Sequence, residues 1–434
     1  MALGGGTFLT QNKVLPGTYI NFISVARASA TLSDRGYATM PLELDWGIDG
    51  EIFEVTNADF QKNSLNIFGY DYTNDKLKGL RDLFLNLKTL YAYRLNSGTK
   101  AANDYATAKC SGVRGNDLKV IIQRNVDDNN LFDVTLLIGA ASIDMQTVTS
   151  SASLVDNDFV IWKKDATLAV TVGVPLTGGT NGTVDGTAHQ TYLDKIESYY
   201  FNTMGVITTE PSIKQLYANY NKRMRDEVGA KFQVVMHQNA ADFEGVINIK
   251  NDVDDEEYSI SSLVYWVTGL QAATEVNRSA LNRRYDGEFT VISSFTQAQL
   301  TKAILNGEFT LHNVGTDVRV LSDINSLVTT TDVKGDVFKE NQTIRVIDQI
   351  ANDIAVLFNT KYLGVVPNDA SGRISLWSDI VRHHEQLQEI RAIENFTDAD
   401  VIVEQGNTKR AVVVSDLVTI VNAMAQLYMT VSIA

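Results

Sequence analysis

Residues 427–434 read Leu427-Tyr428-Met429-Thr430-Val431-Ser432-Ile433-Ala434, and the sequence stops within this strand-like run. The apolar side chains of Leu427, Met429, Val431 and Ile433 alternate with more polar ones, which is the period-2 pattern of a half-buried strand. Such a strand needs a sheet to join. The pattern therefore predicts a strand-forming C-terminal arm over residues 411–434.

The other end of the sequence carries a similar segment. After Pro16-Gly17 the chain reads Thr18-Tyr19-Ile20-Asn21-Phe22-Ile23-Ser24-Val25. We expect an N-terminal arm over residues 1–25, in which Tyr19, Ile20, Phe22 and Val25 carry the pairing. Two strand-like ends indicate main-chain pairing, either within the same molecule or with the next one by β-augmentation. The second arrangement would build a polymer.

The composition narrows the class of protein. A chain of 434 residues is expected to hold two to four domains at about 100 to 200 residues each. Its net charge of −15 argues against nucleic acid and anionic membranes as partners, because phosphate binding needs clustered Lys and Arg. Cys110 is the only cysteine, which excludes a disulfide framework and a CxxC zinc site. The first residues lack a basic region followed by a long apolar run, so we expect no signal peptide and no membrane insertion.

The periodicity predicts an α/β and α+β multidomain protein. Residues 26–92 and 187–325 alternate strand and helix patterns, as in a layered α/β core domain. Within the first part, residues 75–91 are expected to form one helix, with Leu77, Leu80, Phe84, Leu87 and Tyr91 on its apolar face. Residues 93–186 are rich in Gly, Thr, Ser, Asn and Val and predict an inserted all-β domain. Residues 326–410, with two helical patterns and two strand patterns, predict a C-terminal α+β domain.

The sequence contains none of the common catalytic constellations. It has no Gly-Lys dipeptide for a P-loop, no GxSxG elbow and no GxGxxG after a strand. The acidic run at 252–257 lacks the glycine and distal glutamate of a calcium loop. His383-His384-Glu385 has no second histidine at helical spacing, so core or interface histidines are expected rather than metal ligands. We expect no catalytic residue, no cofactor and no metal.

Two further groups invite a functional interpretation. Arg278, Arg283 and Arg284 form the densest basic patch, where phosphate binding is conceivable and salt bridging between subunits is more natural in an acidic chain. Cys110 has no sequence sign of an activating partner and is interpreted as a small inert side chain.

Four short stretches, taken in order, resemble contractile tail sheath proteins of phages and phage-tail-like particles, in the XkdK-like branch. They are Val14 to Phe22, Leu176 to Gly182, Gly364 to Asn368 and Tyr428 to Val431. The resemblance covers essentially the whole chain. Each motif is short, and it is their order along the chain that carries the resemblance.

The resemblance implies a spring-like structural protein and not an enzyme. Such proteins stack as hexameric rings around an inner tail tube and contract at a baseplate trigger to drive the tube through a bacterial envelope. Their partners are further copies, the tube, the baseplate and the tail terminator proteins. The particle would be a virion or tail-like particle assembled in the bacterial cytoplasm. By the same resemblance the C-terminal domain faces the tube, with Arg373, Arg382 and Arg391 as candidate contacts, and residues 93–186 lie outward.

Three alternatives remain at this point. A tail tube protein would also polymerise, but it is usually much shorter. A cytosolic α/β enzyme with an unrecognised active site would explain the layered core. A surface-layer protein or adhesin would explain the β insertion, but it would need a signal for secretion.

Overall fold

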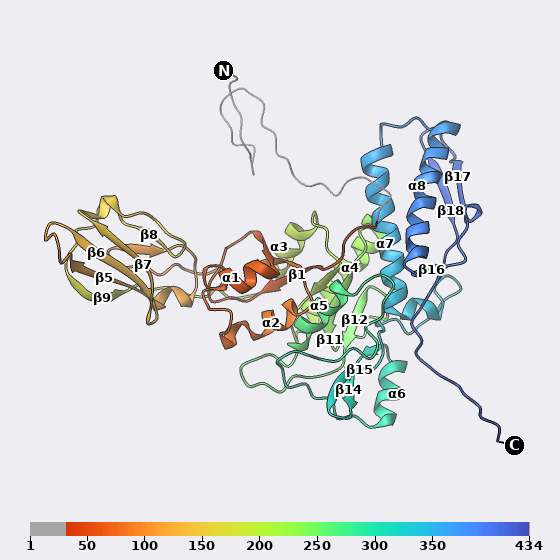
Figure 1. Ribbon diagram of the computed structural model, residues 1–434, viewed down its shortest axis with the longest axis horizontal. Coiled ribbons are helices and arrows are strands. Elements are labelled where there is room, and N and C mark those ends of the chain that lie inside the picture. The colour runs from red at the N-terminus through yellow and green to blue at the C-terminus, as the bar shows by residue number, and fades with distance from the viewer. Residues whose placement is uncertain (1–31, 434) are drawn as a thin grey trace. The chain divides into compact units, whose positions relative to one another are not determined.

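The computed structural model describes residues 32–433 (Figure 1). The described chain divides into two compact units, one of residues 34–349 with 420–433 and the other of residues 32–33 with 350–419. The arm residues Tyr19, Ile20, Phe22 and Val25 lie outside the described residues. The predicted fold class, a multidomain α/β and α+β protein, is confirmed.

A seven-stranded sheet forms the centre of the larger unit. Its strands pair in parallel except for the edge strand β2, which runs antiparallel to β3. Every residue of β11 and β12 is buried, as expected for parallel strands covered on both faces. In spatial order the strands are β13 (Glu308–Phe309), β12 (Val246–Ile249), β11 (Gln233–His237), β10 (Thr203–Gly205), β1 (Tyr37–Leu42), β3 (Thr89–Arg94) and β2 (Ile52–Thr56).

Helices cover both faces of this sheet. Side chains of α1 (Asn57–Phe68), α2 (Lys78–Phe84) and α5 (Leu263–Ala273) share one apolar core with β1. Side chains of α3 (Gly186–Ile196) and α4 (Pro211–Arg223) share a second core with β10 and β11. The same unit contains α6 (Gln297–Leu305) and a hairpin of β14 (Leu311–Val314) and β15 (Asp317–Val320). The prediction of a layered α/β core is therefore confirmed.

The single helix predicted over residues 75–91 is wrong in its second half. A 3-10 turn at Asp75–Leu77 leads into α2, which ends at Phe84, and Tyr91 lies in β3. The sequence Thr-Leu-Tyr-Ala-Tyr-Arg of β3 is rich in aromatic and β-branched residues, which favour strands. The apolar spacing continues past the end of α2 because Leu87, which follows the helix, is buried in the same core as the helix.

The segment between β3 and α3 contains strands and 3-10 turns, and no α-helix occurs in its described residues. Four antiparallel strands form a sheet in the order β7 (Ala141–Val148), β6 (Phe132–Ile138), β5 (Leu118–Arg124) and β9 (Thr171–Pro175). Strands β4 (Ala106–Ala108) and β8 (Val160–Trp162) form a second, smaller sheet. The two sheets enclose their own apolar core. The segment is thus an all-β insertion, while its predicted limits at 93 and 186 stay predictions.

The smaller unit contains two helices and a β-hairpin. Helix α8 (Ala370–Glu389) is capped by Asp369, whose side chain accepts from the amide of Gly372. Strands β17 (Val401–Gln405) and β18 (Val412–Asp416) pair in antiparallel register and β17 packs on α8. The two-residue strands are β16 (Ile393–Glu394) and β19 (Thr419–Ile420).

Helix α7 (Asn341–Leu357) crosses the division between the units, which falls after Gln349. Its first half belongs to the larger unit through buried ion pairs. Arg225 donates to both oxygens of Asp348 at 2.7 Å, and Arg345 donates to Asp323 at 2.6 Å. The domain boundary that the sequence predicts at residue 325 therefore lies N-terminal to the part of α7 that these ion pairs attach to the larger unit.

Candidate assembly surfaces

Within the described residues 32–433, the C-terminal segment is hydrogen-bonded to the rest of its chain only at its root, residues 421–423. Gln342 of α7 donates to the carbonyl of Val421 at 3.1 Å and accepts from the amide of Ala423 at 2.9 Å. The side-chain amide of Gln342 thus offers Val421 and Ala423 the same donor and acceptor that a neighbouring strand would offer. Residues 421–433 contain neither helix nor strand.

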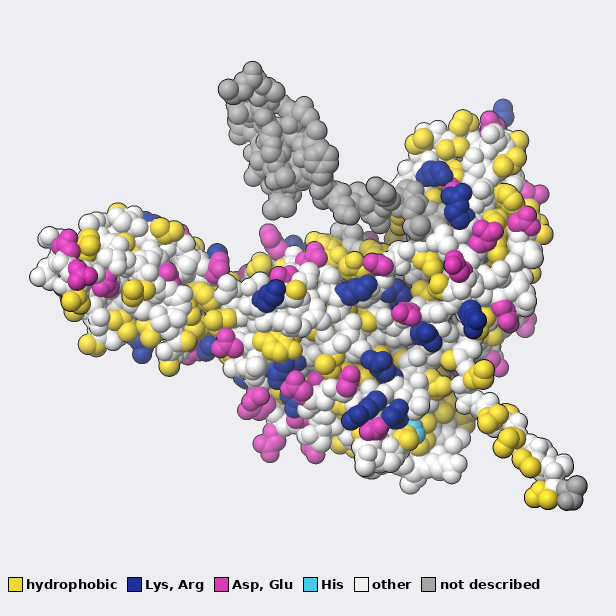
Figure 2. Space-filling model, viewed as in Figure 1, with side chains coloured by type: hydrophobic (Ala, Val, Ile, Leu, Met, Phe, Trp, Pro, Cys, Tyr) yellow, Lys and Arg dark blue, Asp and Glu magenta, His cyan; other side chains and the backbone are white. Residues whose placement is uncertain are grey.

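Beyond this root the side chains are exposed. Met424 is 99% exposed, Leu427 85% and Ile433 94%. Burying one such side chain is worth about 1.5 to 3 kcal/mol, so a run of them in water is a strong sign of an unoccupied interface. Figure 2 shows apolar side chains along the projecting C-terminal segment. The predicted residues Leu427, Met429, Val431 and Ile433 are all exposed, and their pairing as a strand stays a prediction.

The hairpin of the smaller unit has unpaired edges. Strands β17 and β18 pair only with each other among the described residues, and Ile402, Val413 and Leu417 are exposed. A two-stranded hairpin is marginally stable alone in water. Here the indole of Trp377 donates to the carbonyl of Val401 at 3.0 Å, which fixes β17 on α8. The outer edges remain available for another strand.

The two neighbouring histidines of α8 are buried structural side chains. His383 contacts Asp353 at 3.0 Å between Nε2 and Oδ2, and His384 contacts Asp416 at 2.8 Å through the same atoms. The first contact joins α8 to α7, and the second joins α8 to the end of β18. No group of three or more potential ligands in residues 32–433 is placed to hold a metal ion. These contacts agree with the interpretation as core histidines.

The segment leading toward the N-terminus is attached to the same pair of helices. The amide of Leu32 donates to Gln386 of α8, and the amide of Ser33 donates to Asp353 of α7, both at 3.3 Å. The first described residues therefore lie on the smaller unit.

The three predicted tube contacts do not share one face. Arg373 and Arg382 lie nine residues apart on α8, and at 3.6 residues per turn they point to opposite sides. Arg382 is 62% exposed and lies 3.9 Å from Asp379. Arg391 follows the helix with a φ of 61°. Their contact with a tube stays a prediction.

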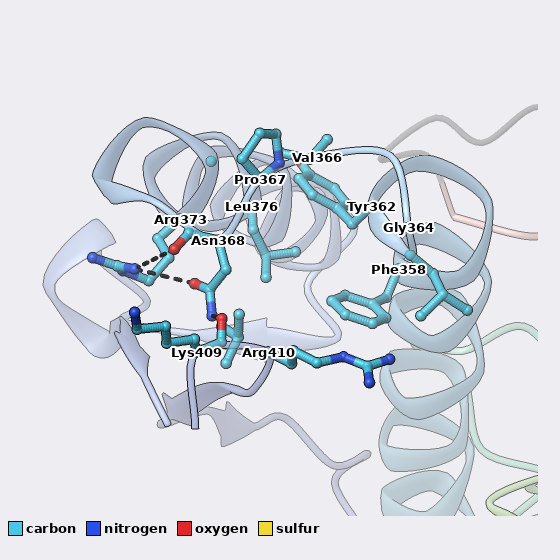
Figure 3. A pocket seen from close by; sticks show the side chains of 13 residues that line it. Phe358, Tyr362, Gly364, Val366, Pro367, Asn368, Arg373, Leu376, Lys409 and Arg410 are labelled. Atoms are coloured by element: carbon cyan, nitrogen blue, oxygen red, sulfur yellow. Dashed lines mark hydrogen bonds between the residues drawn. The ribbon is translucent and has the colours of Figure 1, made fainter. Parts of the chain in front are cut away.

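A pocket of about 280 Å³ opens beside Arg373 in the smaller unit (Figure 3). Phe358 and Tyr362 come from the π-helical turn Phe358–Tyr362 that follows α7, Leu376 comes from α8, and Lys409 and Arg410 come from the turn between β17 and β18. Figure 3 shows the aromatic and aliphatic side chains opposite the segment that carries the two cations. The sequence did not single out Lys409 and Arg410, because only the hairpin brings them to the helices. The polar run Asn407 to Arg410 between two strand patterns was the available signal.

Other residues that the sequence analysis singled out are engaged in contacts within the folded chain or are buried in it. Asp255 of the acidic run binds Lys78 at 2.7 Å, and Arg284 lies 3.3 Å from Asp317. Burial raises the pKa of the Cys110 thiol, which keeps it in the weakly nucleophilic protonated form. None of the helices described combines the length and hydropathy that crossing a membrane requires.

Four sequence-family models match consecutive parts of the chain. They describe the domain III N-terminal region of tail sheath protein Gp18 at residues 35–95, the phage tail sheath beta-sandwich domain at 96–181, the central domain at 182–326 and the C-terminal domain at 333–434. The crystal structure of a sheath tail protein from Desulfitobacterium hafniense is similar with 36% identity and a TM-score of 0.80, covering 90% of this chain and 93% of that one.

Two further proteins are similar over nearly the full length. The XkdK protein of the phage-like element PBSX from Bacillus subtilis strain 168 is 28% identical over 468 residues, covering 99% of this chain and 100% of the relative. The contracted helical sheath of the anti-feeding prophage is similar with a TM-score of 0.58, covering 96% of this chain and 98% of that one. Its 11% identity makes this a likeness of fold alone.

Proposed function

Because the chain belongs to the phage tail sheath protein family, we propose that it polymerises as stacked hexameric rings around an inner tail tube and contracts to drive that tube through a bacterial envelope. As a tail sheath protein it is a structural component of a contractile tail in a virion or tail-like particle. Its partners in this proposal are further copies of itself, the inner tube, the baseplate and the tail terminator proteins. We propose this structural role in preference to the enzyme alternative.

The single observation that carries the polymer proposal is the exposed C-terminal segment. The apolar side chains of residues 424–433 are exposed to solvent, and no described part of their own chain covers them. The hairpin β17–β18 offers open edges for such a strand. Each backbone hydrogen bond of an added strand contributes about 0.5 to 1.5 kcal/mol net, and the apolar row adds burial.

In this proposal the arm of residues 1–25 and, within the predicted C-terminal arm of residues 411–434, the exposed residues 424–433 link neighbouring subunits while the bodies rotate. A strand joined to its body through a short root keeps its ladder when the body turns, since only the root must bend. Contraction then replaces one set of contacts between bodies by a more stable set. The β insertion is proposed to lie on the outer side of the sheath.

Electron microscopy of the purified chain tests the proposal. We expect the full chain to form striated hollow tubes at high concentration. Replacing Leu427, Met429, Val431 and Ile433 together by serine is expected to abolish the tubes. The thermal transition of the monomer should hardly change, because these side chains bury nothing in their own chain.

The intervening positions provide a matched control. Tyr428→Ser with Thr430→Ala changes the opposite face of the same strand and is expected to leave tubes intact. Tubes of normal length from the four-serine variant would contradict the arm linkage. A deletion should begin after Ala423 rather than at 411, because β18 pairs with β17 of its own chain.

A further inference from the structure

The pocket of the smaller unit has an apolar wall. Phe358 lies at its helical side and Leu376 faces it from α8 (Figure 3). Val412 of β18 also lines it. Val366 and Pro367 line its upper rim in the same view. A space of about 280 Å³ accommodates one or two aliphatic side chains.

Three cations and no carboxylate line this pocket. The cations are Arg373, Lys409 and Arg410, and none of them lies within ion-pair distance of a carboxylate among the described residues. The nearby Asp379 is buried and bound by Lys361 and by the hydroxyl of Tyr362. The chain as a whole has a net charge of −15, so this positively charged cluster without a carboxylate has the opposite sign to the rest of the molecule.

One side chain, Asn368, holds the cationic cluster in place. Its amide nitrogen donates to the carbonyl oxygens of Lys409 at 3.1 Å and Ala411 at 2.8 Å. Its side-chain oxygen accepts from Arg373 at 3.1 Å, and its carbonyl accepts from the same guanidinium at 3.2 Å. Asn368 therefore fixes the hairpin turn and Arg373 together, before any ligand binds. Preorganisation of this kind lowers the entropy cost of binding.

We propose that this pocket binds a segment of a partner protein in which an apolar side chain stands next to a carboxylate. The apolar part would enter between Phe358 and Leu376, and the carboxylate would meet the guanidinium and ammonium groups at the mouth. Burial and charge pairing would then act on neighbouring residues of one short segment.

Acidic side chains at the two ends of this chain do not supply that carboxylate, because Asp416 of the C-terminal arm is in contact with His384. Residues 1–31 and 421–434 contain no Asp and no Glu. Pairing of an arm with the nearby strand β18 would leave all three cations unmatched. The proposed occupant is a segment that carries an Asp or Glu side chain, and the pocket thus adds a contact to the arm linkage rather than restating it.

A peptide array tests the proposal in a form that does not require tubes. Eight-residue peptides would carry a central pair that combines Ala, Val, Leu or Phe with Asp, Glu, Asn or Gln. Labelled full-length chain would be applied below the concentration at which it polymerises. We expect pairs with Asp or Glu to bind at least tenfold more strongly than their Asn or Gln counterparts, and Leu or Phe to exceed Ala.

Variants separate the pocket from unspecific attraction. Lys409→Gln with Arg410→Gln is expected to remove the preference for acidic peptides, and Asn368→Ala to weaken it several-fold. Lys100→Gln with Lys302→Gln removes the same charge from exposed positions elsewhere and is expected to have no effect. Circular dichroism would verify that each variant is folded.

Three results would overturn the proposal. They are equal binding of acidic and amide peptides, an unchanged acid preference in the Lys409 and Arg410 variant, and displacement of the best peptide by oleate at a far lower concentration than by the peptide itself. The last would identify a small amphipathic anion as the ligand. Failure of tube formation alone would leave the peptide result unaffected.

Discussion

Asp82 is an acidic side chain held fully buried in the middle of α2. The hydroxyl of Tyr285 donates to it at 2.6 Å, and the amide of Glu288 donates to it at 2.7 Å. Burial disfavours the charged form more than these two bonds favour it, and it raises the pKa of Asp82 to about 6. The carboxylate is therefore a source of strain at neutral pH within a well-packed core.

This raised pKa predicts a pH dependence with a definite sign. The folded protein binds the proton more tightly than the unfolded chain, whose pKa is near 3.8. The stabilising contribution is fully present below the unfolded pKa and is lost as the pH rises through about 6. Asp82→Asn cannot ionise, so it should gain about 1 kcal/mol in free energy of unfolding relative to the wild type between pH 5 and pH 7.5. Urea unfolding at these two pH values measures the difference.

Asp104→Asn, at an exposed position, serves as the control and should follow the wild type at both pH values. If the free energy of unfolding changed equally with pH in the wild type and in Asp82→Asn, Asp82 would have an ordinary pKa. Sequence periodicity placed α2 but could not indicate this burial, because Tyr285 and Glu288 are about two hundred residues away along the chain. The same limit hid Lys409 and Arg410, which reach the pocket only through a hairpin.

Helices α2 and α5 approach each other through glycine. A Cβ atom on Gly269 of α5 would lie 2.2 Å from the carbonyl oxygen of Leu83, and one on Gly79 of α2 would lie 2.4 Å from the ring of Tyr265. A backbone oxygen cannot move aside as a flexible side chain can. Gly269 thus permits the helix contact at the centre of this core.

Gly269→Ala is expected to destabilise the protein by about 1 to 3 kcal/mol, because overpacking outweighs the roughly 1 kcal/mol by which alanine favours a helix. Gly186→Ala is the matched control, since no atom lies within 4 Å of the added Cβ at the first residue of α3. It should be neutral or stabilising. Chemical unfolding of both variants makes the comparison. Equal stability of the two would mean that the helices separate without cost.

The elements differ in how far sequence predicts them. Strand β6 is readily recognised in the sequence, because Phe132 to Ile138 is an apolar-rich run of strand length whose residues alternate between buried and half-buried positions. The helix over residues 75–91 was overextended, because helical spacing persisted into residues of strong strand preference. Residues 427–433 show a strand pattern without a strand. A ladder needs a second edge, and sequence alone does not say which molecule supplies it.

The two chain segments that connect the β insertion to the α/β core lie side by side. The amide of Gly182 donates to the carbonyl of Asn96 at 2.9 Å, so the two connecting segments touch. The fully buried Arg94 binds Asp49 at 3.0 Å and the carbonyl of Ser111 at 2.8 Å, which ties the core to the insertion. The ring of Trp46 packs 6.0 Å from that of Phe159 across the same junction.

This geometry predicts that the insertion can be removed. Replacing residues 97–181 by two glycines should leave a folded core, with a loss of about 3 to 5 kcal/mol because Trp46 becomes exposed and Arg94 loses partners. Adding Trp46→Ser should restore solubility. If the insertion lies outward, this variant should still form tubes of normal striation and smaller outer diameter in electron microscopy. A variant with a cooperative thermal transition and no tubes would instead show that the insertion supplies contacts between subunits, because a folded body and intact arms would then not suffice for assembly.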